Sequence, residues 1–321
     1  MRATRREPVR VTRPARLLIL TSILLLAPMV AGALPSTGAA SSAQHGPRPE
    51  DGSPAPLGAN DWACVPTAAH PRPLVLVHGL GATMDENWSY LSPILESAGY
   101  CVFALTYGER PDFPYLGGLV PMQESARELD AFVDRVLAAT GAAQVDLVGH
   151  SEGTVMPQWW LKKLDGAART HHYVALTPLY DGTTLFAVDL VLDQLLALFP
   201  DADAPGGFDS LCGSCRQFLA GSSFYEELYS DGTMAAPGVG YTTIMTRFDE
   251  LVIPYSSGYL VGPDVENIVL QDVCPLDLSE HALVAFDPVV AHLILNALDP
   301  AHATPVSCGG ALGLGLGTLK L

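Results

Sequence analysis

The pentapeptide Gly149-His150-Ser151-Glu152-Gly153 constrains the fold more than any other feature of the sequence. It directly follows the apolar run at residues 145–148, which predicts a buried strand, and it precedes a helix expected over residues 154–164. In a G-x-S-x-G motif between a strand and a helix, the serine occupies a tight turn that strains its backbone and exposes its hydroxyl. The glycines leave room where side chains would clash with the neighbouring strand and helix. The motif therefore predicts a nucleophilic serine at the carboxyl edge of an α/β sheet.

Short apolar runs alternate with helical patterns through most of the chain, which is typical of a parallel sheet covered by helices. Buried parallel strands are expected at residues 74–77, 101–105, 145–148, 173–177, 241–246 and 267–273. Further helices are predicted at residues 122–140, at 185–199 and at 283–298, where Pro288 places the start of the regular part. The predicted fold class is α/β, with a mostly parallel central sheet flanked by helices.

The N-terminus has the pattern of an export signal. Residues 1–16 contain six arginines and one acid, residues 17–30 are mostly apolar, and Ala31-Gly32-Ala33 has the small residues of a signal-peptidase site. A membrane anchor is the alternative, but this apolar stretch rises only about 21 Å as a helix, against a hydrocarbon core of ~30 Å. We therefore expect a signal peptide over residues 1–33, cleaved near Ala33, and a secreted, extracellular protein.

The charge balance is strongly acidic. The chain has 17 basic and 34 acidic residues, a net charge of −17; without residues 1–33 it has 11 basic and 33 acidic residues, a net charge of −22. Nucleic acid is excluded as a partner, because phosphate binding needs Lys and Arg to displace counterions. Hydrophobic residues make up 49% of the chain, which is enough for a sizeable core and excludes disorder along its whole length.

Composition also divides the chain. Residues 34–60 are rich in Ala, Ser, Pro and Gly without a hydrophobic period, which predicts a flexible linker. Residues 309–321 alternate Gly with Leu and are expected to form a tail outside the core. Residues 61–308 between them are predicted to form one domain.

The mature chain contains six cysteines, an even number that indicates disulfides in an exported protein. Zinc binding is the alternative, but the sequence has a single C-x-x-C and no second pair at zinc-ligand spacing. A redox role for the C-x-x-C requires a thioredoxin-like context that is absent around it. The disulfide candidates are Cys64, Cys101, Cys212, Cys215, Cys274 and Cys308.

A serine hydroxyl needs a base to become a nucleophile, and in this chain order the acid and then the histidine follow the serine. Asp249 ends the strand-like region at residues 241–247, and His281 follows the last predicted strand. Both lie where strand ends meet loops, which is the edge of the sheet where sites are built. We therefore predict Ser151, Asp249 and His281 as the catalytic residues.

Other residues compete for these roles. Asp181 follows the strand at residues 173–177 and is the alternative acid, whereas the side chain of Glu250 is expected to point elsewhere. His292 lies within a predicted helix, and His171 and His172 precede their strand and so lie at its wrong end.

Acyl transfer also needs hydrogen-bond donors for the oxyanion of the tetrahedral intermediate. The backbone N–H of Glu152, directly after the nucleophile, is one expected donor. The backbone N–H of Leu80 is the other, in His78-Gly79-Leu80-Gly81 after the strand at residues 74–77. His78 is expected to shape this loop by hydrogen bonding.

The ordered set of His78-Gly79, the serine motif, Asp249 and His281 resembles that of α/β-hydrolases. More closely, the chain is similar to secreted bacterial lipases of the class 2 type, related to actinobacterial triacylglycerol lipases. The likeness runs over about residues 62–308 and includes Asn87-Trp88-Ser89 and Thr246-Arg247-Phe248-Asp249-Glu250. It implies ester hydrolysis through an acyl-enzyme, with Ser151 as nucleophile, His281 as base and Asp249 orienting the base. Glu152 departs from the Gln, Met or Leu common at that position.

The resemblance implies further features of the α/β-hydrolase domain. A small cap or lid insertion is expected near residues 184–235, in which the helix at residues 185–199 either forms a lid or packs on the sheet. Independently of the resemblance, Tyr107, Phe113 and Tyr115 follow the strand at residues 101–105 and are candidates to line a pocket. Topology and the resemblance together pair Cys64 with Cys101, Cys212 with Cys215, and Cys274 with Cys308.

These observations lead to one functional hypothesis and its alternatives. The chain is expected to be a secreted serine ester hydrolase, a triacylglycerol lipase or carboxylesterase, that needs no metal or organic cofactor. Its expected partners are a lipid or other ester substrate and, transiently, a lipid–water interface, and it is expected to be a monomer. An acyltransferase on the same fold and a non-catalytic α/β-hydrolase binding module are the alternatives.

Overall fold

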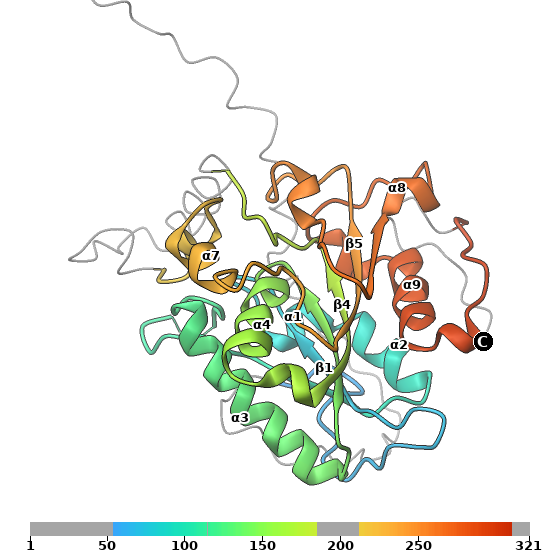
Figure 1. Cartoon of the computed structure of the whole chain (residues 1–321). Helices are drawn as coiled ribbons and strands as arrows, with labels where there is room; N and C mark the ends of the chain where they lie inside the picture. The colour runs from blue at the N-terminus through green and yellow to red at the C-terminus, as the bar shows by residue number, and fades with distance from the viewer. Residues whose placement is uncertain (1–53, 114, 185–211, 310–321) are drawn as a thin grey trace, which may run out of the picture. The chain divides into compact units, whose positions relative to one another are not determined.

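The computed structural model describes residues 54–113, 115–184 and 212–309, which belong to one compact unit (Figure 1). The predicted signal peptide, the helix at residues 185–199 and nearly all of the Gly/Leu tail lie outside the described residues. Near the start of the described residues, Ala59 and Asn60 pair with the edge of the sheet. The backbone N–H of Asn60 donates to the carbonyl of Val102 at 2.9 Å. Within the described ranges, no helix is long and apolar enough to cross a membrane.

A six-stranded parallel sheet with the order β2-β1-β3-β4-β5-β6 forms the centre of this unit. The predicted α/β class with a mostly parallel sheet is therefore confirmed. All six expected strands are present, at β1 (Leu74–Val77), β2 (Val102–Leu105), β3 (Val145–His150), β4 (Thr170–Leu176), β5 (Gly240–Met245) and β6 (Val265–Val269).

The last strand differs from its predicted bounds. The expected strand at residues 267–273 ends at Val269, and Leu270–Val273 forms the short helix α8. Leu270 and Gln271 are both buried in this turn. A short apolar run has no period that distinguishes a buried strand from a buried helical turn, so the sequence could not place this boundary.

The helix predicted at residues 122–140 is confirmed as α3 (Met122–Thr140). Its apolar face is buried, and it ends at Gly141, whose φ of 70° suits glycine and closes the helix. The predicted role of Pro288 is confirmed too, because it begins α9 (Pro288–Leu298) after Asp287 caps the backbone N–H groups of Val289 and Val290. The remaining helices include α1 (Met84–Trp88), α2 (Leu91–Ser97), α4 (Glu152–Lys163) and α7 (Ser223–Leu228).

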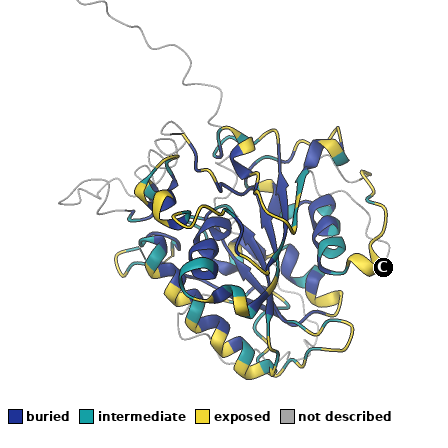
Figure 2. Ribbon diagram, viewed as in Figure 1, coloured by how far each residue is buried: buried dark blue, intermediate teal, exposed yellow. Residues whose placement is uncertain are grey.

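Helices cover both faces of the sheet, so the unit has two cores (Figures 1 and 2). Successive strand residues point to opposite faces, and β1 divides accordingly. Val75 and Val77 pack in the core that includes α3 and α4, whereas Leu74 and Leu76 pack in the core that includes α1, α2 and α9. All four side chains are fully buried, which explains why the strand reads as a continuous apolar run.

The described part of the predicted cap lies between β4 and β5. It contains the 3-10 turn η3 (Cys215–Phe218) and α7. Its start is fixed to the main unit, because the Gly213 N–H donates to the carbonyl of Leu119 at 2.7 Å and the Ser214 hydroxyl donates to the carbonyl of Gly118 at 2.6 Å.

The three predicted disulfides are formed, and they use all six cysteines. Cys64–Cys101 joins the start of the unit to the residue before β2, and Cys274–Cys308 joins the segment after α8 to the chain beyond α9. Cys212–Cys215 closes a local turn at the start of η3.

Removing the long disulfides is expected to destabilise the protein more than removing the local one. Cys64–Cys101 and Cys274–Cys308 span 37 and 34 residues, whereas Cys212–Cys215 spans 3. In the chain-entropy model, each long bridge contributes about 3–4 kcal/mol to the free energy of unfolding, and the short one clearly less. Denaturant unfolding of each paired Cys→Ala variant measures this. An equal loss for the pair Cys212 and Cys215 would contradict the expectation.

Candidate active site

The Ser151 turn has the geometry that the G-x-S-x-G motif predicts. Ser151 lies between β3 and α4 with a φ of 54° and a ψ of −120°, a conformation that side-chain-bearing residues rarely adopt. A Cβ added to Gly149 would lie 1.9 Å from the carbonyl oxygen of Gly153, and one added to Gly153 would lie 2.0 Å from that of Val77. Only glycine fits at both positions, and the strained turn brings Ser151 to the carboxyl edge of the sheet.

Ser151, His281 and Asp249 form one chain of hydrogen bonds. The Ser151 Oγ lies 2.8 Å from Nε2 of His281, and Nδ1 of His281 lies 2.9 and 3.0 Å from the two carboxylate oxygens of Asp249. With the proton on Nδ1, the ring donates to Asp249 and leaves Nε2 free to accept the serine proton. The His281 and Asp249 side chains are 5% and 2% exposed, so the bonds between them are shielded from water.

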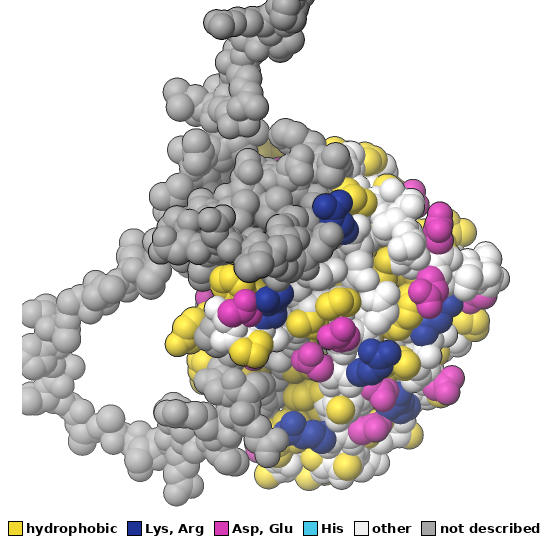
Figure 3. All heavy atoms as spheres, turned by 90° about the vertical axis from the view of Figure 1, so that its left-hand side faces the viewer, with side chains coloured by type: hydrophobic (Ala, Val, Ile, Leu, Met, Phe, Trp, Pro, Cys, Tyr) yellow, Lys and Arg dark blue, Asp and Glu magenta, His cyan; other side chains and the backbone are white. Residues whose placement is uncertain are grey.

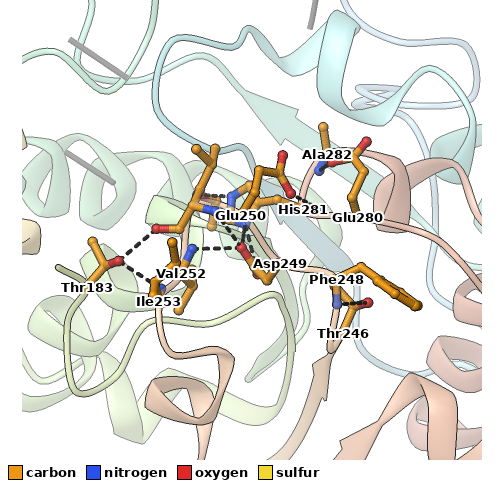
Figure 4. Close-up of polar contacts among 12 residues, drawn as sticks. Thr183, Thr246, Phe248, Asp249, Glu250, Val252, Ile253, Glu280, His281 and Ala282 are labelled. Atoms are coloured by element: carbon orange, nitrogen blue, oxygen red, sulfur yellow. Dashed lines mark hydrogen bonds and ion pairs between the residues drawn. The ribbon is translucent and has the colours of Figure 1, made fainter. Parts of the chain in front are cut away.

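The carboxylate of Asp249 also holds the loop that follows this residue. Asp249 Oδ1 accepts the backbone N–H groups of Leu251 and Val252 at 3.0 and 2.7 Å (Figure 4). These bonds fix the carboxylate toward His281, as a group that orients an imidazole requires.

Carboxylates set the basicity of His281. Its burial lowers the pKa, but the charge of Asp249, the hydrogen bond to it, and the charges of Glu250 and Glu280 outweigh burial and raise the pKa above 6.5. A stronger base accepts the serine proton more readily, which suits His281 to general-base chemistry.

Glu250 contacts the backbone of His281 and not its ring. Its Oε2 accepts the His281 N–H at 3.3 Å, while Glu280 accepts the N–H of Ala282 at 2.7 Å (Figure 4). Burial and the charge of Glu280 raise the pKa of Glu250 to about 7. The Glu250 side chain therefore does not bind the imidazole ring as a triad acid would, in agreement with the sequence analysis. It still lies beside the backbone of His281.

The competing residues lie elsewhere. Asp181 is exposed in the loop after β4, where its N–H donates to the carbonyl of Ser257 at 3.0 Å. His171 contacts Asp146, and His172 contacts Thr242, both near the start of β4. His292, on α9, contacts Thr304 at 2.7 Å.

Residues 78–82 form a loop beside Ser151, which we call the oxyanion loop because it contains Leu80, one of the two predicted oxyanion donors. A Cβ added to Gly79 would lie 3.0 Å from Cβ of Ser151, so the loop approaches the serine closely. The loop is anchored by a pair of bonds with residue 117: the Gly81 N–H donates to its carbonyl at 2.9 Å, and the Gly117 N–H donates to that of Ala82 at 3.1 Å.

His78 shapes this loop, in agreement with its expected structural role. Its Nδ1 donates to the Gly79 carbonyl at 2.8 Å, and its Nε2 accepts the Tyr107 N–H at 3.2 Å. The Tyr107 ring stacks on His78 at 4.2 Å, and its hydroxyl donates to the His78 carbonyl at 2.8 Å. Burial lowers the pKa of His78 to about 4, so the ring is neutral.

The three residues predicted as candidates to line a pocket differ in how far they are buried. Tyr107 is fully buried behind the oxyanion loop and so does not line a pocket, and Tyr115 is 79% exposed. Phe113 is half-buried. The hydroxyl of Tyr107 finds its partner on the loop, a long-range contact that the spacing of aromatics along the sequence does not reveal.

Two residues that the sequence analysis did not select join the parts of the site. His150 lies with Nδ1 2.9 Å from Oδ1 of Asn87 and with Nε2 2.9 Å from the carbonyl oxygen of His281. Asn87 Oδ1 also accepts the Gly79 N–H at 3.0 Å, so His150 and Asn87 connect the oxyanion loop to the backbone of His281. The two partners of His150, Asn87 and His281, are 63 and 131 residues away from it in sequence, and no local pattern identifies such pairs.

Within the described parts of the chain, no three His, Cys, Asp or Glu side chains are grouped so as to hold a metal ion.

Comparison with known proteins places the chain among lipases. The family model described as Lipase (class 2) matches residues 71–293. A triacylglycerol lipase of Burkholderia plantarii is 35% identical over 108 residues, which cover 32% of this chain and 26% of that protein. A triacylglycerol lipase of Pseudarthrobacter phenanthrenivorans is 37% identical over 93 residues, which cover 27% of each. The matches thus span about a quarter of the length of these curated relatives.

Among solved structures, lipase B of Aspergillus fumigatus is similar with a TM-score of 0.57 and 22% identity, over 76% of this chain and 56% of that one. At this identity the likeness shows a shared fold.

Proposed function

The chain belongs to the class 2 lipase family, and on that basis we propose that it is a serine ester hydrolase that works through an acyl-enzyme on Ser151. The observation that supports this most directly is the chain of hydrogen bonds from Ser151 through His281 to Asp249. A serine, a histidine and a carboxylate in this order activate a hydroxyl for attack on an ester carbonyl.

The proposed mechanism follows from these groups. Nε2 of His281 accepts the serine proton as Oγ attacks the ester carbonyl, and Asp249 stabilises the imidazolium that forms. The backbone N–H groups of Leu80 and Glu152 donate to the oxyanion. His281 then gives its proton to the leaving alcohol, and water repeats the cycle to release the acid.

We propose a triacylglycerol as the substrate, with a short-chain carboxylic ester as the alternative. The two curated relatives are triacylglycerol lipases. Large apolar side chains are exposed on the loops next to Asp249 and His281, namely Phe248 at 46%, Leu278 at 56% and Leu283 at 41%. Such side chains suit transient contact with the lipid–water interface at which water-insoluble esters reside.

We also propose that the protein is secreted as a monomer after cleavage near Ala33. Three disulfides support an oxidising compartment. On the face shown in Figure 3, basic side chains are interspersed with acidic ones. Among the ion pairs of the described residues, Arg169 pairs with both Asp130 and Asp134. This pattern supports the exclusion of nucleic acid as a partner.

A substrate series tests the proposal. The purified protein is offered p-nitrophenyl esters of increasing acyl length and emulsified triacylglycerol, with and without an added alcohol as acceptor. We expect hydrolysis of the long esters and of the emulsion. Turnover limited to short, soluble esters would assign a carboxylesterase, and preferential transfer to the alcohol would assign an acyltransferase. No turnover of any ester would overturn the proposal and favour a binding module.

A further inference from the structure

The carboxyl group of Glu152 is buried against the oxyanion loop. The residue is fully buried, and neither side-chain oxygen has a hydrogen-bond partner in the described part of the chain. A Cβ built on Gly118 would lie 2.3 Å from Oε2 of Glu152 and 3.2 Å from Cα of Leu80. The carboxyl group, Gly118 and the backbone of Leu80 therefore meet at one point, next to residue 117, which anchors the loop.

Among the described residues, no charge compensates this carboxyl group. His78 in the loop and Tyr107 stacked on it are neutral at ordinary pH, because burial lowers the pKa of His78 to about 4 and raises that of Tyr107 well above 10. No ion pair to Glu152 forms among the described residues. Burial raises the pKa of Glu152 well above its usual 4.5, since an unpaired carboxylate is unfavourable in an apolar site.

We infer that Glu152 is a positioning residue that must be a neutral acid for catalysis, and that its ionisation slows the acyl-transfer step. The inference rests on the proposed function, because it takes the N–H groups of Leu80 and Glu152 as the oxyanion donors. A carboxylate directly behind the loop opposes the negative charge that develops on the substrate oxygen. A neutral carboxyl group fills the same space and holds the loop without this repulsion.

The two titrations act on the rate with opposite sign: loss of the His281 proton with rising pH raises it, and loss of the Glu152 proton lowers it. Glu250 accepts the His281 N–H, the charge of Glu280 also acts on His281, and Glu128 on α3 accepts the Gly108 N–H at 3.0 Å next to Tyr107. Their titration is unaffected by a change at position 152, so a matched substitution separates them from Glu152.

The test compares kcat for a soluble p-nitrophenyl ester across pH in wild type, Glu152→Gln, Glu152→Met and Glu152→Asp. Wild type and Glu152→Asp keep an ionisable group and are expected to lose activity at alkaline pH, by about tenfold or more, since a single oxyanion donor is worth roughly 10²–10³ in kcat. Glu152→Gln and Glu152→Met are expected to keep their maximal kcat at alkaline pH. Glu128→Gln is the control and should retain the wild-type decline. The same alkaline decline in Glu152→Gln and Glu152→Met would overturn the inference.

A second readout does not depend on activity. Because the pKa of Glu152 is raised in the folded state, the stability that the neutral acid provides is complete below about pH 4.5 and decreases as the pH rises through the folded-state pKa. The melting temperature of Glu152→Gln should therefore rise relative to wild type between acidic and alkaline pH. A difference that does not change with pH would contradict a neutral Glu152.

Labelling with a fluorophosphonate separates this inference from the proposed function. If Ser151 is labelled in wild type but the pH profiles of the Glu152 variants match wild type, the inference fails alone. If wild-type Ser151 is not labelled, the proposed function fails with it. Labelling of Ser151 in each variant also reports that the site is folded.

Discussion

Replacing Ser151 with alanine is expected to lower kcat for ester hydrolysis by about 10⁵- to 10⁶-fold. The reason is that the variant lacks the oxygen that lies 2.8 Å from Nε2 of His281, and no other group can form the acyl-enzyme at that point. In serine hydrolases, loss of the nucleophile costs about as much as loss of the whole triad, and a residual rate of roughly 10³–10⁴ over water remains from the oxyanion donors and substrate binding.

The measurement is kcat for a p-nitrophenyl ester at saturating substrate, together with thermal unfolding of the variant. The melting temperature should change little, because alanine carries a Cβ like serine and so leaves the backbone strain of the turn unchanged. Ser92→Ala is the control: this serine is buried on α2, its hydroxyl has no hydrogen-bond partner among the described residues, and the variant should keep its activity. A loss of less than tenfold in Ser151→Ala would contradict its assignment as the nucleophile.

Asp249→Asn is expected to lower kcat by about 10⁴-fold, as replacement of the triad carboxylate does elsewhere. The two carboxylate oxygens at 2.9 and 3.0 Å from Nδ1 hold the ring so that Nε2 faces Ser151. An amide can donate to Nδ1 and so stabilise the wrong tautomer. It still offers one oxygen to the N–H groups of Leu251 and Val252, so the loop is expected to keep its shape.

The pH profile adds a second readout to this prediction. Asp249 is the strongest of the groups that raise the pKa of His281, so its neutralisation lowers that pKa. Activity requires neutral His281, and the acid limb of kcat/KM should therefore shift to lower pH in Asp249→Asn. Asp181→Asn is the control and should leave both the rate and the limb near wild type. A larger loss in Asp181→Asn than in Asp249→Asn would reverse the assignment of the acid.

Local patterns were sufficient to predict most of the fold. The bounds of α3 follow from an amphipathic period that ends at Gly141, and the Ser151 turn follows from two glycines at positions where the backbone leaves no space for a Cβ. Both features are determined by residues close together in sequence. The end of β6 was not predicted correctly, because the apolar run crosses its boundary with α8, from Val269 to Leu270, without a break.

Long-range polar contacts could not be predicted in the same way. The sequence indicated only the backbone of Glu152 and gave no reason to expect its side chain against Gly118, since that contact depends on how the segment after β2 folds over the oxyanion loop. Likewise, the link from Asn87 through His150 to His281 joins three separate segments. Hydrogen-bond partners of this kind are set by the three-dimensional arrangement of elements, and residue spacing carries no signal for them.

Covalent labelling tests the central claim, that Ser151 is the nucleophile, most directly. The purified protein is treated with a fluorophosphonate, digested and mapped by mass spectrometry, while activity is followed in parallel. We predict one adduct, on Ser151, whose formation matches the loss of activity and which is absent from Ser151→Ala. An adduct on a different serine with equal loss of activity, or full activity after Ser151 is modified, would contradict this account.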